Sequence, residues 1–301
     1  TKLYVLDFTD KDISEYTLST AFDVSTASYV DNFNFSAQDS QGQVYDLVFN
    51  TDGTKMFIVS NASDSIIEYH LSTAFDVSTA SYDSSLSTFG SGVTIDNAPV
   101  ALAFNTDGTK MFMVGAANDK VNEYTLSTGF DISTASYVDG FSISSDFAVY
   151  GLVFNTDGTK MFLMDAYDDD IHEYTLSTGF DVSTASVSGS FVQTKDTSPV
   201  GLSFNPDGTK MFITGTGSNS IHEFALTTPF SLVNISGEHT GDVIDTSSTS
   251  NKDSDVDGDT LTVTQIKKSG GSNSAVSSGT TNTDGTSVTG TYGVLTIGAD
   301  G

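Results

Sequence analysis

Near the end of the chain, four aspartates stand at alternate positions around a glycine: Asp253, Asp255, Asp257 and Asp259, with Gly258 between the last two. Carboxylates in this spacing allow a loop to wrap a hard cation with oxygen ligands. An EF-hand would need Glu at its twelfth position, where this chain has Thr264, so the stretch does not match that template. We predict a calcium site at these four residues, and a solvated acidic turn is the alternative.

Other carboxylates recur in the chain with a simpler explanation. One set immediately precedes a glycine in each repeat described below, where turn chemistry explains an aspartate: Asp52, Asp107, Asp157 and Asp207. Lysines follow these turns, and we expect them to pair with nearby carboxylates at the surface, where ion pairs contribute little: Lys55, Lys110, Lys160 and Lys210.

Two further groups could bind a cation. The densest acidic run comprises Asp165, Asp168, Asp169 and Asp170, for which the alternative is a solvated loop tip. His172 and His222 occupy equivalent repeat positions and could bind metal as a pair. Because Ser14, Ile67 and Asn122 stand there in the other repeats, we interpret the position as a variable surface position.

No set of residues typical of catalysis is present. The sequence has no Cys, no Arg, no G-x-S-x-G and no H-E-x-x-H. One glutamate recurs in every repeat, which indicates a structural role, because an active site usually breaks the symmetry: Glu15, Glu68, Glu123, Glu173 and Glu223. We therefore predict that the chain is not an enzyme.

The charge balance limits the possible partners. The 301 residues have a formal net charge of −28, from 39 acidic residues and 11 lysines. Such a chain should repel nucleic acid and anionic membranes. The absence of Cys excludes disulfides and zinc–thiolate sites, and no apolar stretch reaches the roughly 20 residues that span a bilayer. We expect an extracellular location, at a cell surface or in a virion.

The elements that carry these residues form an internal repeat. FNTDGTKMF occupies 49–57, 104–112 and 154–162, and FNPDGTKMF occupies 204–212. A second block, of the type EYTLSTAFDVSTASY, starts at Glu15 and recurs in five copies, so that five units are present and the first lacks its opening segment. The sequence starts and stops in mid-pattern, and we interpret it as a piece of a longer protein.

Each unit has the pattern of four short strands. In the second unit these are about 44–50, 54–60, 65–72 and 82–89, and an Asp-Gly hairpin joins the first two. The strand TKMFIVS is apolar on both faces, so that it needs a layer on each side, as in propeller blades stacked around an axis. One Phe per unit should anchor the FDVSTA loop on its blade: Phe22, Phe75, Phe130, Phe180 and Phe230. Either five blades close the ring, or the units belong to a ring of six or seven.

Two resemblances follow from these motifs. FNxDGTKMFIV resembles the F-S-P-D-G-T-x-[LM]-[YF]-V repeat of YVTN-type propellers of bacterial and archaeal surface proteins, over residues 1–235. NKDSDVDGDTLTV (251–263) and TYGVLTIGADG (291–301) are similar to cadherin-like VCBS-type adhesin repeats. The second resemblance implies a modular extracellular protein, exported by a type I route.

The sequence thus predicts an all-β chain, with a β-propeller over 1–235 and a partial cadherin-like β-sandwich over 236–301. The predicted function is a non-enzymatic surface module, in adhesion or as a structural component of a surface layer, appendage or virus particle. The alternative is a calcium-dependent propeller hydrolase or lactonase-like enzyme. The expected partners are a glycan or protein on another surface, or copies of the chain itself, without nucleic acid and without membrane insertion.

Overall fold

The computed structural model describes residues 1–7, 9–39, 43–88, 98–116, 119–144, 147–232, 235–236, 262–266, 272–281, 284–289 and 294–299. The chain divides into two compact units, Thr1–Ile235 and Ser236–Gly301. The predicted calcium ligands Asp253, Asp255, Asp257 and Asp259 lie outside the described residues, and that site stays a prediction.

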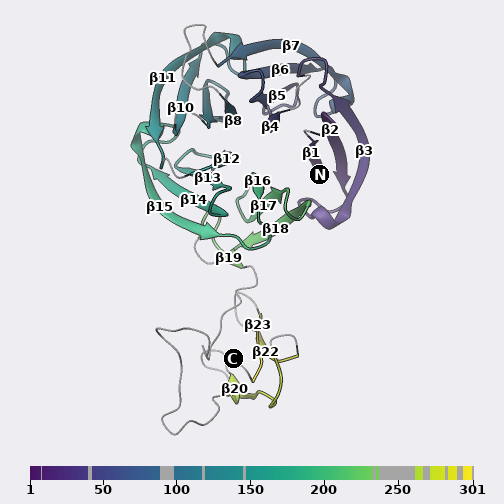
Figure 1. Ribbon diagram of the computed structural model, residues 1–301, viewed down its shortest axis with the longest axis vertical. Coiled ribbons are helices and arrows are strands. Elements are labelled where there is room, and N and C mark those ends of the chain that lie inside the picture. The colour runs from purple at the N-terminus through teal and green to yellow at the C-terminus, as the bar shows by residue number, and fades with distance from the viewer. Residues whose placement is uncertain are drawn as a thin grey trace. The chain divides into compact units, whose positions relative to one another are not determined.

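The first unit is a β-propeller of five blades, which confirms the predicted fold class (Figure 1). The first blade contains β1 (Lys2–Asp7), β2 (Asp12–Leu18) and β3 (Ala27–Asn34). The second contains β4 (Val44–Phe49), β5 (Lys55–Ser60), β6 (Ser65–Leu71) and β7 (Ala80–Ser87). The third contains β8 (Pro99–Phe104), β9 (Lys110–Gly115), β10 (Lys120–Leu126) and β11 (Ala135–Ser142).

The last two blades repeat this order. The fourth contains β12 (Val149–Phe154), β13 (Lys160–Asp165), β14 (Asp170–Leu176) and β15 (Ala185–Val192), and the fifth contains β16 (Pro199–Phe204), β17 (Lys210–Gly215), β18 (Ser220–Leu226) and β19 (Ile235–Ser236). The strands β4, β8, β12 and β16 lie nearest the axis, and β3, β7, β11 and β15 lie at the circumference (Figure 1). β1 corresponds in sequence to the second strand of the other blades.

The ring closes between the fifth blade and the first. The ammonium group of Lys210 on β17 donates a hydrogen bond of 2.7 Å to the carbonyl oxygen of Phe22. The same kind of contact joins each of the remaining four pairs of neighbouring blades, as described below. Five blades therefore complete the ring in this structure, and the alternative of six or seven is wrong.

The Asp-Gly hairpins form as predicted. Gly53 has a φ of 73°, in the left-handed region that favours glycine. Asp52 Oδ1 accepts hydrogen bonds from the backbone N–H and the hydroxyl of Thr54, at 3.0 and 2.6 Å. The ring of Phe75 packs so closely on this turn that a Cβ on Gly53 would lie 2.3 Å from it. The expectation that this Phe anchors its loop on the blade is confirmed.

The loop after that Phe also forms from its own residue types. It contains one 3-10 turn in each of the first four blades: η1 (Val24–Thr26), η2 (Val77–Thr79), η3 (Ile132–Thr134) and η4 (Val182–Thr184). An aspartate precedes each turn and accepts a hydrogen bond from the backbone N–H two residues later, such as Asp131 from Ser133 at 3.1 Å. Side chain–backbone bonds within the loop therefore help to fix its conformation.

The core lies between the blades. On β5, Met56, Phe57, Ile58 and Val59 are all fully buried. Met56 and Ile58 belong to a cluster with residues of the first blade, whereas Phe57 and Val59 pack with residues of the third, such as Met111. A strand apolar on both faces is thus covered on both faces, as the sequence predicts.

Bulges interrupt the strands at both edges of the blades. The register between the third strand and the outer strand shifts at an equivalent place in four blades, for example between Glu68 and Tyr69. A similar shift affects the four inner strands near their starts, between Val44 and Asp46 on β4. Each extra residue shifts the alternation of side chains along its strand.

The second unit contains two small sheets among its described residues. β20 (Gln265–Ile266) pairs with β21 (Ser274–Ala275), and β22 (Thr286–Thr289) pairs with β23 (Val294–Ile297). Val276, Ile297 and Ala299 form a small buried cluster. The assignment to a cadherin-like repeat stays a prediction. In the described parts of both units, no helix has the length and apolar character needed to cross a membrane.

Candidate functional site

The two histidines that could have formed a metal pair do not meet. His172 Nε2 lies 3.8 Å from Asp165 Oδ2 in the fourth blade, and His222 Nε2 lies 3.9 Å from Asp196 Oδ2 in the fifth. Within the described ranges, no three His, Asp or Glu side chains converge closely enough to hold a metal ion. The interpretation of their repeat position as a surface position is wrong, because the equivalent Asn122 is fully buried.

The acidic run of the fourth blade is part of a hairpin rather than a loop tip alone. Asp165 is fully buried, and its Oδ1 accepts hydrogen bonds from the N–H groups of Ala148 and Tyr167, both at 2.9 Å. Asp169 has a φ of 59°, which suits a turn. Burial, chiefly, raises the pKa of Asp170, and the neighbouring carboxylates add to the rise. Asp165 thus terminates β13 by binding backbone N–H groups.

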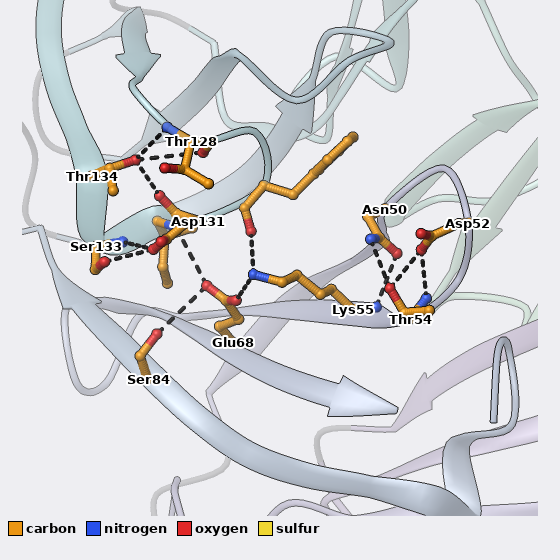
Figure 2. Close-up of polar contacts among 12 residues, drawn as sticks. Asn50, Asp52, Thr54, Lys55, Glu68, Ser84, Thr128, Asp131, Ser133 and Thr134 are labelled. Atoms are coloured by element: carbon orange, nitrogen blue, oxygen red, sulfur yellow. Dashed lines mark hydrogen bonds and ion pairs between the residues drawn. The ribbon is translucent and has the colours of Figure 1, made fainter. Parts of the chain in front are cut away.

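The repeated lysine and glutamate join neighbouring blades. In Figure 2, Lys55 and Glu68 extend from the second blade toward the loop of the third that contains Asp131. Lys55 forms an ion pair with Glu68 and donates to the carbonyl oxygen of Phe130 at 2.8 Å. Glu68 Oε2 accepts a hydrogen bond from the N–H of Ile132 at 3.3 Å. We call this set of contacts the interblade clasp.

Equivalent lysine contacts occur at all five joints, and the first four joints also contain the hydrogen bond from a backbone N–H to the glutamate. The lysine-to-carbonyl distances lie between 2.5 and 2.8 Å, with these donors and acceptors: Lys2 and Phe75, Lys55 and Phe130, Lys110 and Phe180, Lys160 and Phe230, and Lys210 and Phe22. The glutamate side chains of the first four clasps are only 2–7% exposed, whereas Glu223 is 28% exposed. The structural interpretation of the recurring glutamate fits these contacts, but the expected surface ion pairs are in fact partly buried.

A pocket lies where the inner strands face one another. Its volume is about 330 Å³. It is lined by residues of β4, β8, β12 and β16 together with parts of two Asp-Gly turns and one loop: Asp46, Leu47, Val48, Leu102, Ala103, Phe104, Thr106, Tyr150, Gly151, Leu152, Val153, Phe154, Asn155, Thr156, Phe180, Gly201 and Leu202. We call it the axial pocket.

Asp46 is the one charged residue among those that line the axial pocket. Its Oδ1 accepts a hydrogen bond from the N–H of Leu47, and its Oδ2 accepts one from the N–H of Leu102, both at 2.8 Å. Burial raises the pKa of Asp46 to about 6, against the lowering effect of these two hydrogen bonds. Asp46 can therefore gain and lose a proton near neutral pH.

Asp46 also breaks the symmetry of the repeat. It pairs with Val59 in the register of β4 and β5, and the equivalent positions of the next three blades are Ala101, Gly151 and Gly201. The sequence interpretation missed this residue. The available signal was a carboxylate at a repeat position that otherwise has only Ala or Gly.

Two tyrosines of the inner strands contact each other, and one of them lines the same pocket as Asp46. Tyr150 lines the pocket, and its ring centroid lies 5.4 Å from that of Tyr45, at an angle of 47°. Burial raises the pKa of Tyr45, and the neighbouring Tyr150 adds to the rise. The equivalent positions of the third and fifth blades have Val100 and Val200. Because its pKa is raised, the hydroxyl of Tyr45 stays protonated at neutral pH and can donate a hydrogen bond.

The comparisons with known proteins concern the fold. No family model matches the sequence, and no curated protein matches it. Similar solved structures include a protein of unknown function from Desulfotomaculum acetoxidans, with 13% identity and a TM-score of 0.43 over 76% of this chain and 62% of that one. A periplasmic gluconolactonase from Pseudomonas aeruginosa has 15% identity and a TM-score of 0.44, over 74% and 62% of the two chains.

A third similar structure is a protein of Bacteroides uniformis, provisionally assigned as a 6-phosphogluconolactonase. It has 12% identity and a TM-score of 0.44, over 75% of this chain and 64% of that one. This chain thus spans less than two thirds of the length of each of these proteins. At such identities and TM-scores, the similarity assigns no function to this chain.

These comparisons require one correction. The prediction that the chain is not an enzyme is contradicted, because proteins named as lactonases are among the similar structures. The argument from symmetry also fails in detail, since Asp46 is a residue that does break the symmetry. No observation directly supports a role in adhesion, in a surface layer or in a particle.

Proposed function

We propose that the chain is a hydrolase of small esters or lactones, with the axial pocket as its active site and Asp46 as its acid–base group. The observation that carries the proposal is the position of Asp46: a carboxyl group with a pKa near 6, on the wall of a pocket at the propeller axis. Titratable groups whose pKa is shifted by burial, and which lie in a concave site, are typical of active sites.

The pKa of Asp46 suits proton transfer. A general base is most effective when its pKa lies near the working pH, and an ordinary aspartate, with a pKa of about 3.9, is too weak a base at pH 7. Asp46 combines a raised pKa with substantial ionisation at pH 7. Each carboxylate oxygen accepts one backbone hydrogen bond and keeps further acceptor capacity for a water molecule.

The reaction that these groups allow adds one water molecule across an acyl C–O bond. Ionised Asp46 takes a proton from a water whose oxygen forms a bond with the acyl carbon. The C–O bond of the ester or lactone then breaks, and Asp46 returns the proton to the leaving oxygen. The hydroxyl of Tyr150 would donate a hydrogen bond to the carbonyl oxygen as negative charge develops there.

The test is hydrolysis of D-glucono-1,5-lactone, with simple esters as further substrates, followed by acid release at constant pH. Lactone hydrolysis is the activity named for proteins of similar fold, which makes this lactone the first substrate to try. We expect the variant Asp46→Asn to lose at least 100-fold in kcat. Asp31→Asn, which alters an exposed carboxylate on β3, should leave kcat unchanged. Full activity of the Asp46→Asn variant would overturn the proposal.

A further inference from the structure

The wall of the axial pocket offers no positive charge to a ligand. Its seventeen lining residues include no Lys and no His, and the chain has no Arg. The lysines of the second strands are engaged elsewhere, because each binds a glutamate and a backbone carbonyl in an interblade clasp, as Lys160 does with Glu173 and Phe230. A phosphate or carboxylate in the pocket would therefore have no ion-pair partner.

Asp46 makes the pocket unfavourable for anions. Above its pKa of about 6 this carboxyl group is mostly ionised, and its partly buried position weakens the screening of its charge by water. An anionic ligand would face repulsion from Asp46 without compensation. A ligand without charge would instead donate hydrogen bonds from its hydroxyl groups to the carboxylate.

Most of the remaining polar groups of the wall are already used by the protein. The hydroxyl groups of Thr106 and Thr156 donate to backbone carbonyls of the next blade, at 3.3 and 3.4 Å. Asn155 accepts from the N–H of Lys160 and donates to Thr159. The polar contacts left for a ligand are therefore concentrated at Asp46 and Tyr150.

The ring of Tyr150 supplies an apolar surface in the same pocket lining. Its contact with Tyr45 limits its movement, so that a ligand would meet a preorganised ring. The volume of about 330 Å³ is at the small end of the range for small-molecule sites, roughly 300–1,000 Å³. A small ring with hydroxyl groups on its edge matches both the aromatic surface and the single carboxylate.

We infer that the axial pocket binds small, uncharged, hydroxylated rings and rejects their phosphorylated forms. The claim that such a ring is a substrate rests on the proposed function, whereas the claim that it binds does not. The inference assigns the substrate class of the site: an uncharged sugar lactone rather than a sugar phosphate lactone. Asp46 and Tyr150 determine the specificity, the first through charge and the second through its ring.

Binding is measured apart from turnover, with three stable probes that share one pyranose ring and differ in charge. These are methyl β-D-glucopyranoside, glucose 6-phosphate and glucosamine, titrated at pH 7.5 and followed by ligand-observed NMR. We expect the uncharged glucoside to bind at least ten-fold more tightly than the phosphate. In Asp46→Asn this ratio should fall to about three-fold or less, because the repelling charge is gone.

The contribution of Tyr150 to binding is tested with a residue that occurs at the equivalent position of other blades. Tyr150→Val introduces the residue found at Val100 and Val200, and we expect it to weaken binding of the glucoside about five- to ten-fold. Tyr150→Phe keeps the ring and should retain most of the affinity. Tyr167→Val changes a tyrosine that is 75% exposed and outside the pocket lining, and should have no effect.

The outcomes separate the two claims. Selective binding of the glucoside without hydrolysis of any lactone would reject the proposed function and support the inference. Equal or tighter binding of glucose 6-phosphate would overturn the inference even if lactones are hydrolysed. Glucosamine, whose partly protonated amino group the charge of Asp46 attracts, should bind at least as tightly as the glucoside. Much weaker binding of glucosamine, or binding of none of the three probes, would overturn the inference as well.

Discussion

The ammonium group of Lys210 lies 2.7 Å from the carbonyl oxygen of Phe22, a residue 188 positions earlier in the chain. This hydrogen bond has the same donor and acceptor types as the one between Lys55 and Phe130, which joins the second blade to the third. The ring thus closes with a contact already used at its other joints. Among the described residues, however, Glu223 makes no hydrogen bond to the N–H of Val24, whereas Glu68 does bind Ile132.

This difference predicts unequal contributions of the clasps to stability. Glu68→Gln should lower the free energy of unfolding by about 1–3 kcal/mol, because a buried lysine–glutamate contact and a hydrogen bond to Ile132 are both weakened. Glu223→Gln should cost less than about 1 kcal/mol, since its side chain is partly exposed. Urea denaturation of the two variants gives the comparison. Equal losses would show that the joints are equivalent despite their geometry.

The Asp-Gly hairpins predict a large effect of one methyl group. Gly108 has a φ of 71°, and a Cβ there would lie 2.2 Å from the ring of Phe130. Gly108→Ala should therefore lower the free energy of unfolding by about 2–4 kcal/mol, through backbone strain and a displaced ring. Gly189→Ala is the matched control, because no atom lies within 4 Å of its Cβ position. Similar thermal unfolding of both variants would contradict this account.

Asp46 predicts a dependence of stability on pH. Its pKa of about 6 in the folded chain exceeds that of an unfolded aspartate, so the folded state binds this proton more tightly. The stabilisation is fully present below about pH 4 and is lost as the pH rises through 6, a change of about 2–3 kcal/mol. Asp46→Ala should lack this component. Urea midpoints between pH 4 and 7.5 provide the measurement, and parallel profiles for the two proteins would reject the assignment.

The predicted calcium site at Asp253, Asp255, Asp257 and Asp259 is tested by metal addition and removal. We expect calcium to raise the midpoint of a thermal transition of the full chain, by the equivalent of about 2.7 kcal/mol at 100 times the Kd. A chelator should reverse the shift, and Asp257→Asn should abolish it. Asp245→Asn, in the same acidic region of the sequence, is the control. The absence of any shift in magnesium-free buffer would reject the site.

Features set by neighbouring residues could be predicted from the sequence. The turn at Asp52 and Gly53 and the loop that Phe75 anchors depend on contacts within one blade, and both agree with expectation. The double-faced burial of β5 was also predictable, because apolar residues on both faces require two covering layers. The number of blades needed the structure, since it depends on the angle at which the blades pack.

The candidate site could not be predicted in the same way. The pKa of Asp46 is raised because the fold buries its carboxyl group, and its hydrogen-bond partner Leu102 is 56 residues away in the next blade. Asn122 is fully buried, although its repeat position tolerates several residue types. The glutamate of each of the first four clasps binds a loop 59 to 64 residues distant. Such contacts follow from the way blades meet and not from the local pattern.

The bulges of the outer strands have a consequence for the protein in concentrated solution. A strand at the rim of a sheet can recruit a strand from another molecule when its backbone is straight and regularly spaced. Here the rims of four blades are each interrupted by an extra residue, such as the one opposite Glu68 and Tyr69 on β7. Neighbouring molecules therefore find no continuous template on these rims, and the protein should remain dispersed where a smooth-edged repeat would grow into fibres.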